Sequence, residues 1–134
     1  MAGMIAKVLR VGVAGVAALA LVPSMSSVAQ AGAPSSKAAL REAVTDYSRA
    51  YLNGNGTKAY RMLTPRCRAV IPRGPFNDSS DLAAIIYGNL HIETYRAKVR
   101  GTRARVTYTF SDPDLNQRRE PWVKVSGRWK NNDC

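Results

Sequence analysis

Three side chains that can transfer or share protons recur at alternate positions of one segment: His91, Glu93 and Tyr95. Residues two apart in a β-strand project from the same face. An imidazole beside a carboxylate could serve as general base and orienting partner if burial moved their pKa values toward neutrality. His91 and Glu93 are therefore a candidate catalytic pair for isomerisation, dehydration or cyclisation. The competing interpretation makes His91 a rim residue, since Leu90 and Ile92 occupy the opposite face.

A basic cluster surrounds Gly101-Thr102 and is the densest positive segment after residue 31. Its members are Arg96, Lys98, Arg100, Arg103 and Arg105. Such a cluster is typical of a surface that binds nucleic acid or an anionic envelope polymer, with an affinity that falls steeply as salt rises. Charges that protect a sheet edge from pairing with another chain explain the pattern equally well.

Two tryptophans, Trp122 and Trp129, are expected on one sheet face with Lys124 between them. Exposed indole rings beside a cation form a stacking platform for sugars or bases. Packing in the hydrophobic core is the more common role of such rings. The sequence leaves both roles open.

The chain has two cysteines, Cys67 and Cys134, and one histidine. In an oxidising compartment an even pair of cysteines predicts a disulfide. A catalytic thiolate is the lesser alternative, because it would need His91 beside it and the sequence does not show that His91 approaches either cysteine. With a single histidine and no ligand spacing, we expect neither a metal site nor a cofactor.

Apolar periodicity and turn residues define the elements that carry these side chains. Apolar residues at steps of three and four predict a helix over Lys37–Leu52, with Ser36 as its cap. Further helices are expected over Lys58–Leu63 after Thr57, from Pro65 after Thr64, and over Asp81–Tyr87 after Ser80, with a loop over Pro72–Ser79. Alternation then predicts strands on either side of Gly101-Thr102 and of Ser126-Gly127.

The first predicted hairpin pairs Val99 with Ala104, Ala97 with Val106 and Tyr95 with Tyr108. The second pairs Val125 with Arg128, and by parity it places Cys134 where a helix carrying Cys67 can meet it. Helices followed by antiparallel strands indicate an α+β domain, with helices covering one face of a curved antiparallel sheet.

Residues 1–31 have the pattern of a cleavable signal peptide. Lys7 and Arg10 precede the uncharged segment Val11–Val22, and Ala29-Gln30-Ala31 offers a cleavage site, with Ala33 as a second. The apolar run is shorter than the roughly 20 residues that span a bilayer. We therefore expect a secreted protein without a stable membrane anchor after cleavage.

Cleavage after Ala31 leaves a linker, residues 32–36, and one domain, residues 37–134. Because residues 1–31 hold two basic and no acidic side chains, 18 of the 20 Lys and Arg and all nine Asp and Glu remain. That excess of positive charge favours anionic surroundings, although solubility alone also accounts for it.

Several segments together resemble secreted actinobacterial members of the nuclear transport factor 2-like superfamily. They are Ala50-Tyr51-Leu52-Asn53-Gly54 before Ala59-Tyr60, Leu63-Thr64-Pro65-Arg66-Cys67, Ala104-Arg105-Val106, and Gly127-Arg128-Trp129-Lys130-Asn131-Asn132-Asp133-Cys134. The resemblance covers most of Lys37 to Cys134. It implies the cone-like fold shared with SnoaL-like polyketide cyclases and ketosteroid isomerases, in which helices and a bent sheet enclose a pocket.

In this sequence that pocket would be lined by Tyr47, Tyr95, Tyr108 and Phe110. The Asp or His–Asp motif of the enzymatic members has no match here, so no catalytic role carries over. The sequence thus predicts a non-enzymatic binding domain for a small apolar ligand or an envelope partner. The resemblance also implies homodimers formed through the open sheet face.

Overall fold

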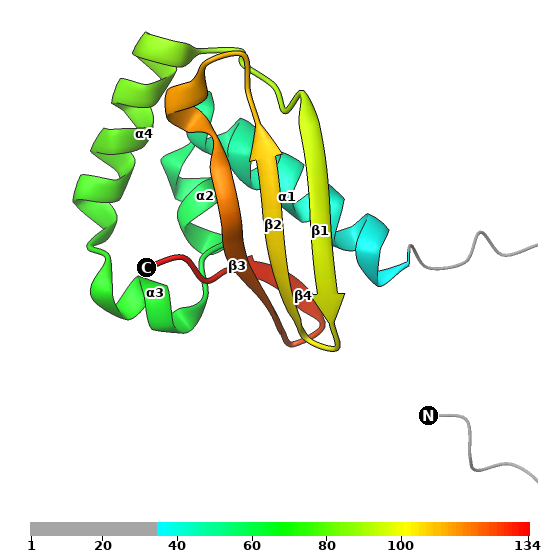
Figure 1. The fold of residues 1–134 in the computed structure, drawn as a ribbon. Coiled ribbons are helices and arrows are strands. Elements are labelled where there is room, and N and C mark those ends of the chain that lie inside the picture. The colour runs from blue at the N-terminus through cyan, green and yellow to red at the C-terminus, as the bar shows by residue number, and fades with distance from the viewer. Residues whose placement is uncertain (1–34) are drawn as a thin grey trace, which may run out of the picture. The chain divides into compact units, whose positions relative to one another are not determined.

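The helices precede the strands along the chain, as predicted. The computed structural model of the protein describes residues 35–134, so the predicted signal peptide and residues 32–34 of the linker lie outside the described residues. The helices are α1 (Ser36–Leu52), α2 (Gly56–Arg61), α3 (Pro65–Val70) and α4 (Arg73–Tyr87). The strands are β1 (Thr94–Arg100), β2 (Arg103–Thr109), β3 (Gln117–Val125) and β4 (Arg128–Asn131), with a 3-10 helix at Pro113–Leu115 (Figure 1). The predicted α+β class is confirmed.

The strands form one antiparallel sheet in the order β1-β2-β3-β4. The first hairpin has the predicted register, with Tyr95 opposite Tyr108, Ala97 opposite Val106 and Val99 opposite Ala104. The second pairs Val125 with Arg128, also as predicted. Gly101, Ser126 and Gly127 have positive φ values of 58°, 52° and 77°, the backbone conformation that tight hairpin turns require.

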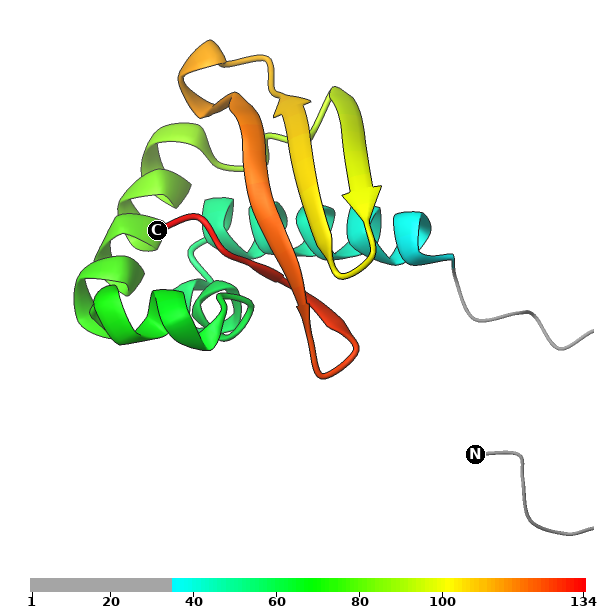
Figure 2. The same cartoon turned by 60° about the horizontal axis from the view of Figure 1, so that its bottom comes forward.

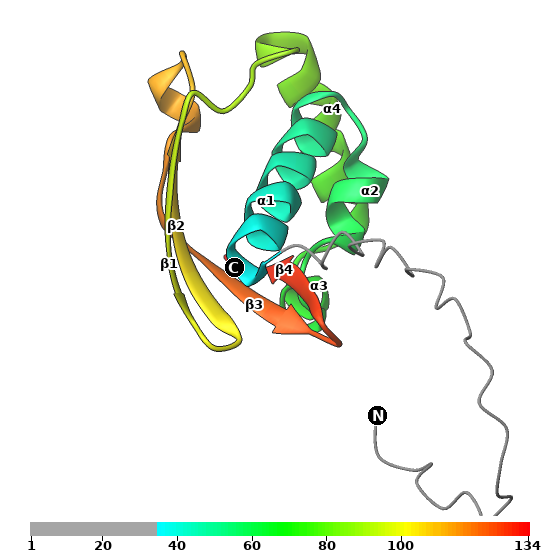
Figure 3. The same ribbon diagram turned by 90° about the vertical axis from the view of Figure 1, so that its right-hand side faces the viewer.

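A β-bulge bends the sheet between β2 and β3. Val106 pairs with Glu120 but Tyr108 pairs with Gln117, so β3 carries one more residue than β2 across this stretch. Arg119 occupies the bulge with a φ of 52°, and its backbone N–H donates to Thr107 Oγ1 at 3.1 Å. Bulges increase local twist. In Figure 3 the sheet accordingly curves past α1, so that β4 approaches α3.

Asn131 joins the end of β4 to the segment between α2 and α3. Its N–H donates to the Met62 carbonyl at 2.9 Å, and its own carbonyl accepts from the Thr64 N–H at 2.8 Å. The side chain of Asn131 is 2% exposed. These bonds fix the C-terminal segment against the helical half of the domain.

The core lies between the inner face of the sheet and α1, which runs across the strands in Figure 2. Its fully buried side chains include Leu40, Val44, Val106 and Trp122. Trp129 is also buried, and its indole N–H donates to the Ser36 carbonyl at 3.1 Å. A helix with an apolar face packed on alternating strand residues thus builds the domain.

Two predicted helix caps are wrong by one or two positions. Ser35 rather than Ser36 caps α1, accepting from the Ala38 N–H at 3.2 Å. Asn55 rather than Thr57 caps α2, accepting from the Lys58 N–H at 3.1 Å. Asn is at least as good a cap as Thr, and α2 begins at Gly56, two residues before the predicted start at Lys58. Thr64 caps α3 as predicted.

The predicted loop over Pro72–Ser79 is wrong, because α4 begins at Arg73. Pro75 falls in the first helical turn, where a missing N–H leaves no hydrogen bond unmade. Phe76 packs edge-on against the rings of Tyr51 and Tyr60, with centroids 5.4 and 5.5 Å away. Ser80 is not a cap; its buried hydroxyl donates to the Tyr51 carbonyl at 2.7 Å.

Within residues 35–134, none of the helices is long and apolar enough to cross a membrane.

Candidate functional site

A cavity of about 260 Å³ lies between α1, α4, the sheet and the C-terminal segment. Aromatic rings form much of its wall, and polar groups gather on β3 and beside β4. Its lining residues are Tyr47, Ser48, Tyr51, Leu52, Phe76, Tyr108, Phe110, Leu115, Gln117, Glu120, Asn131 and Asp133.

Glu120 is the buried carboxyl of this cavity, with 5% of the residue exposed. Its Oε1 accepts from Trp122 Nε1 at 2.6 Å and from the Tyr108 hydroxyl at 2.9 Å, and Oε2 lies 3.1 Å from the same hydroxyl. Burial raises the pKa of Glu120 to about 7, although the hydrogen bonds from Trp122 and Tyr108 oppose that shift. This carboxyl is therefore ready to gain or lose a proton near neutral pH.

The strand register accounts for the inward direction of Glu120. It pairs with Val106, which is fully buried, and it stands two residues before the fully buried Trp122. Arg118 and Arg119, which precede it, are exposed, and the bulge lies at Arg119. Glu120 thus lies among apolar neighbours at the point where the sheet bends.

Two tyrosines flank the carboxyl and keep their protons. Burial, with the nearby Glu120 charge, raises the pKa of Tyr47 well above its ordinary value. The same two causes raise the pKa of Tyr108. The Tyr47 ring meets Trp122 edge-on at a centroid distance of 5.8 Å. At neutral pH both phenols are therefore neutral hydrogen-bonding groups in the cavity.

The cavity lining has the opposite charge to the rest of the protein. It contains two carboxyl groups, Glu120 and Asp133, and no Lys, Arg or His, whereas the chain carries a net charge of +11. Carboxylates between aromatic faces attract organic cations and hydrogen-bond donors. The chemistry of the lining thus selects against anionic ligands.

Three of the four residues predicted to line a pocket do so: Tyr47, Tyr108 and Phe110. Tyr95 does not line this cavity. Its ring lies beside the Arg41 guanidinium, 5.3 Å from ring centroid to Cζ. The hairpin register correctly puts Tyr95 on the inner face, but β1 is the edge strand and lies too far from the cavity.

His91 and Glu93 do not form a pocket pair. Both are exposed, both precede the first residue of β1, and neither lines the cavity. Leu90 and Ile92 pack against the core instead. Leu90 and Ile92 occupy the inner face of this segment because burying apolar side chains stabilises the fold, whereas burying a charge destabilises it.

The tryptophans are core residues rather than a stacking platform. Trp122 is fully buried and Trp129 is 4% exposed. Lys124 lies between them as expected, with its Nζ 5.3 Å from the centroid of the Trp129 ring.

The basic cluster is brought together on the other face of the sheet. Its five predicted members are all exposed and line a groove with Thr107, Ala97, Ala104 and one further cation, Arg119. The bulge in β3 places Arg119 on this surface. The sequence pattern did not predict that position for Arg119.

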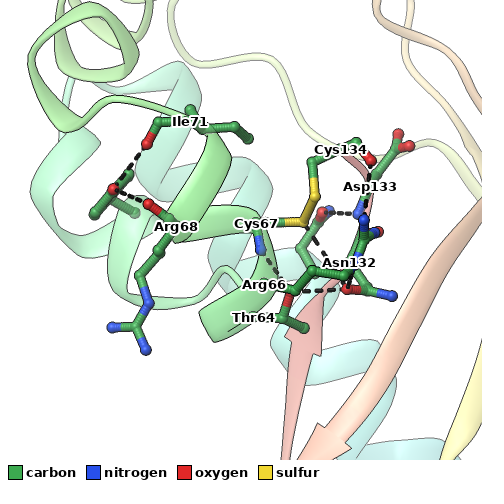
Figure 4. The surroundings of a disulfide bond; sticks show 10 residues. Thr64, Arg66, Cys67, Arg68, Ile71, Asn132, Asp133 and Cys134 are labelled. Atoms are coloured by element: carbon green, nitrogen blue, oxygen red, sulfur yellow. Dashed lines mark hydrogen bonds between the residues drawn. A yellow bond between two sulfur atoms is a disulfide. The ribbon is translucent and has the colours of Figure 1, made fainter.

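The predicted disulfide joins Cys67 and Cys134, whose Cα atoms are 5.5 Å apart (Figure 4). Asn132 Oδ1 accepts from Thr64 Oγ1 at 2.8 Å and from Arg66 Nε at 3.2 Å. Arg66 also donates to the Asn132 carbonyl at 2.9 Å. The bridge and these bonds hold the C-terminus, and with it Asp133, beside the cavity.

No known family model matches the sequence, and no curated protein matches it. Within residues 35–134 no group of three or more His, Cys, Asp or Glu side chains could hold a metal ion. A proposal for the function of the protein therefore rests on the chemistry of the described residues.

Proposed function

We propose that the protein is an exported binding domain that holds a small ligand in the cavity at Glu120. The ligand would have an apolar body and a cationic or hydrogen-bond-donating group. The observation that carries this proposal is a buried carboxyl, 5% exposed, at a cavity in which five of the twelve lining residues are aromatic. A glutamine would accept from Trp122 and Tyr108 without the desolvation of a charge, so the carboxyl is best explained by a ligand that needs it.

The bent sheet with helices on one face supports assignment to the nuclear transport factor 2-like cone fold. Export is supported by the signal-peptide pattern and by the disulfide, which persists in oxidising compartments. On this proposal the mature protein begins at Gly32 or Pro34 and is released.

A second candidate function is proton transfer on the bound ligand, by an isomerase, dehydratase or cyclase. It is favoured by the pKa of Glu120, which lies at about 7 and suits a general base or acid at neutral pH. Glu120 would replace the exposed His91 and Glu93 in this role. The neutral Tyr47 would donate a hydrogen bond to developing negative charge, while Tyr108 continues to donate to Glu120.

The first experiment is intact mass spectrometry of the protein from culture medium, in native and then denaturing conditions. A ligand that remains through purification appears as added mass lost on denaturation. The chain mass also locates the first residue and shows whether the protein is two hydrogens lighter before reduction. A chain that retains residues 1–31 would contradict export.

A thermal-shift comparison then tests the role of Glu120. Small aromatic or alicyclic amines are paired with neutral isosteres of the same shape, and the amine should stabilise the protein more. Glu120→Gln should abolish that difference, while Glu93→Gln, which changes an exposed carboxylate, should preserve it. Equal shifts for amine and isostere would contradict the proposed ligand class.

Proton transfer is tested by incubating any captured ligand with the protein in D₂O. Enzymatic exchange would incorporate deuterium into the ligand, and Glu120→Gln would stop it. Binding of the ligand without deuterium incorporation would contradict proton transfer and would agree with a binding protein.

A further inference from the structure

The sheet face that points away from α1 carries six cations, five on β1 and β2 and one on β3. No helix of the described residues covers that face (Figure 3). Its groove has a volume of about 720 Å³, and its lining contains no acidic and no aromatic residue. We call it the basic face, and its cations are Arg96, Lys98, Arg100, Arg103, Arg105 and Arg119.

The register places like charges directly opposite one another on the basic face. Lys98 pairs with Arg105, and Arg100 pairs with Arg103. Like charges at directly opposed positions destabilise a sheet. Threonine, the residue present at position 107 on the same face, would avoid that repulsion at these four positions, and it favours strands equally well. The arrangement therefore carries a folding penalty that the sheet itself does not require.

Protection of an exposed edge does not account for the basic face. In the order β1-β2-β3-β4 only β1 and β4 are edge strands. Arg103 and Arg105 lie on β2, and Arg119 lies in the bulge of β3. Charges on these inner strands protect no edge, so half of the cluster needs another explanation.

The spacing of the cations fits a ligand with regularly repeated anionic groups. Alternate residues of a strand project about 7 Å apart, and neighbouring strands lie about 5 Å apart. The face thus presents two short rows of cations and a further one at Arg119. Five of the six are arginines, whose planar forks bind phosphate oxygens in pairs. No aromatic ring is present to stack on a base or a sugar.

We propose that the basic face binds a linear phosphate polymer of the cell envelope through its phosphate groups alone. The positive charge of this face also opposes homodimers formed through it, since two copies would bring twelve cations together. This site is separate from the cavity, whose lining holds two carboxyls and no cation. The domain would thus have an anchoring face and a ligand cavity on opposite sides of one sheet.

The test measures binding of the purified protein to long-chain inorganic polyphosphate, by fluorescence anisotropy, between 50 and 200 mM salt. Six phosphate contacts predict a slope of about −4 for log affinity against log salt, a fall of about 300-fold over that range. A flat salt response or no binding would overturn the proposal.

A matched pair of triple variants separates the basic face from net charge. Lys98→Gln, Arg100→Gln and Arg103→Gln together should reduce the slope to about −2 and weaken binding at 50 mM by at least about 10-fold. Lys37→Gln, Arg68→Gln and Arg73→Gln remove three exposed cations from the helices and should weaken it less than about 3-fold. Equal losses would mean that net charge alone attracts the polymer.

Two further measurements complete the test. Thermal melting should show the sheet triple variant to be as stable as the unaltered protein or more so, because opposed like charges are relieved. Single-stranded DNA of the same charge should bind no more tightly than polyphosphate. A preference of 10-fold or more for DNA would overturn the assignment to a phosphate polymer without bases.

Discussion

The Tyr108 hydroxyl lies within hydrogen-bonding distance of both carboxyl oxygens of Glu120, 2.9 Å from one and 3.1 Å from the other. A phenol on β2 thus holds a carboxyl on β3 across the bend of the sheet. With the Trp122 indole at 2.6 Å, the carboxyl is fixed in orientation while it titrates.

Glu120 makes the stability of the protein fall as pH rises from about 4.5 to about 7. The unfolded carboxyl titrates at 4.5 and the folded one at about 7. In that window the native state binds the proton and the unfolded state does not, so each rise in pH favours unfolding. The total loss is about 3 kcal/mol.

Glu120→Gln removes this pH dependence, and the variant should match or exceed the stability of the unaltered protein at pH 8. Urea unfolding at pH 5, 6, 7 and 8 measures both curves. Every other group is common to the two proteins, so the difference between the curves reports Glu120 alone. Parallel curves would show that Glu120 is not the titrating group.

Tyr108→Phe should raise the pKa of Glu120 further, because the Tyr108 hydrogen bond lowers it. At pH 8 the loss of a bond to a buried charge should destabilise the fold by about 2 kcal/mol. At pH 5, where the carboxyl is protonated, the effect should be smaller. Carboxyl chemical shifts from nuclear magnetic resonance report the pKa directly.

Tyr95→Phe is the matched control for that variant. The Tyr95 hydroxyl is buried without a hydrogen-bond partner among residues 35–134. Its removal should be neutral or stabilise the fold by up to about 1 kcal/mol, and it should leave the titration of Glu120 unchanged. Equal destabilisation by both variants would mean that losing a hydroxyl, and not losing the contact with Glu120, causes the effect at Tyr108.

The sequence predicts the strands better than the helix boundaries. Hairpin pairing follows from glycine turns and alternation, which are local, and the register of Val99 with Ala104 is confirmed. The start of α4 depends on Phe76 packing against Tyr51 and Tyr60. That contact is not local, so Pro72 and Pro75 alone indicate a loop.

The burial of Glu120 could not be predicted from the sequence, for a related physical reason. Glu120 follows Arg118 and Arg119, and a charged run normally indicates a solvent-exposed strand. The only local sign that Glu120 is buried is its position two residues before Trp122. The bulge at Arg119 interrupts the two-residue alternation on the N-terminal side of Glu120. His91 and Glu93 have the regular alternation that Glu120 lacks, yet they precede β1 and are exposed.

The disulfide contributes a large share of stability. Bridging Cys67 and Cys134, 67 residues apart, restricts the unfolded chain by about 4 kcal/mol in the loop-entropy model. The double variant Cys67→Ser, Cys134→Ser leaves no free thiol and should melt at least about 15 °C lower. Reduction of the unaltered protein should give the same shift. An unchanged melting temperature would mean that the Arg66 contacts to the C-terminal segment suffice.

Two glycines near helix starts should respond to alanine in opposite directions. A Cβ on Gly56 would lie 2.7 Å from Asn77 Oδ1 and 2.9 Å from Asn77 Cα, so α2 and α4 would have to separate. Gly56→Ala should destabilise the fold by about 1 to 3 kcal/mol.

A Cβ on Gly74 would meet no atom within 4 Å. Gly74→Ala should stabilise by about 0.5 kcal/mol, because alanine restricts the unfolded chain. Urea unfolding measures both, and a stabilising Gly56→Ala would show that α2 and α4 are not in close contact.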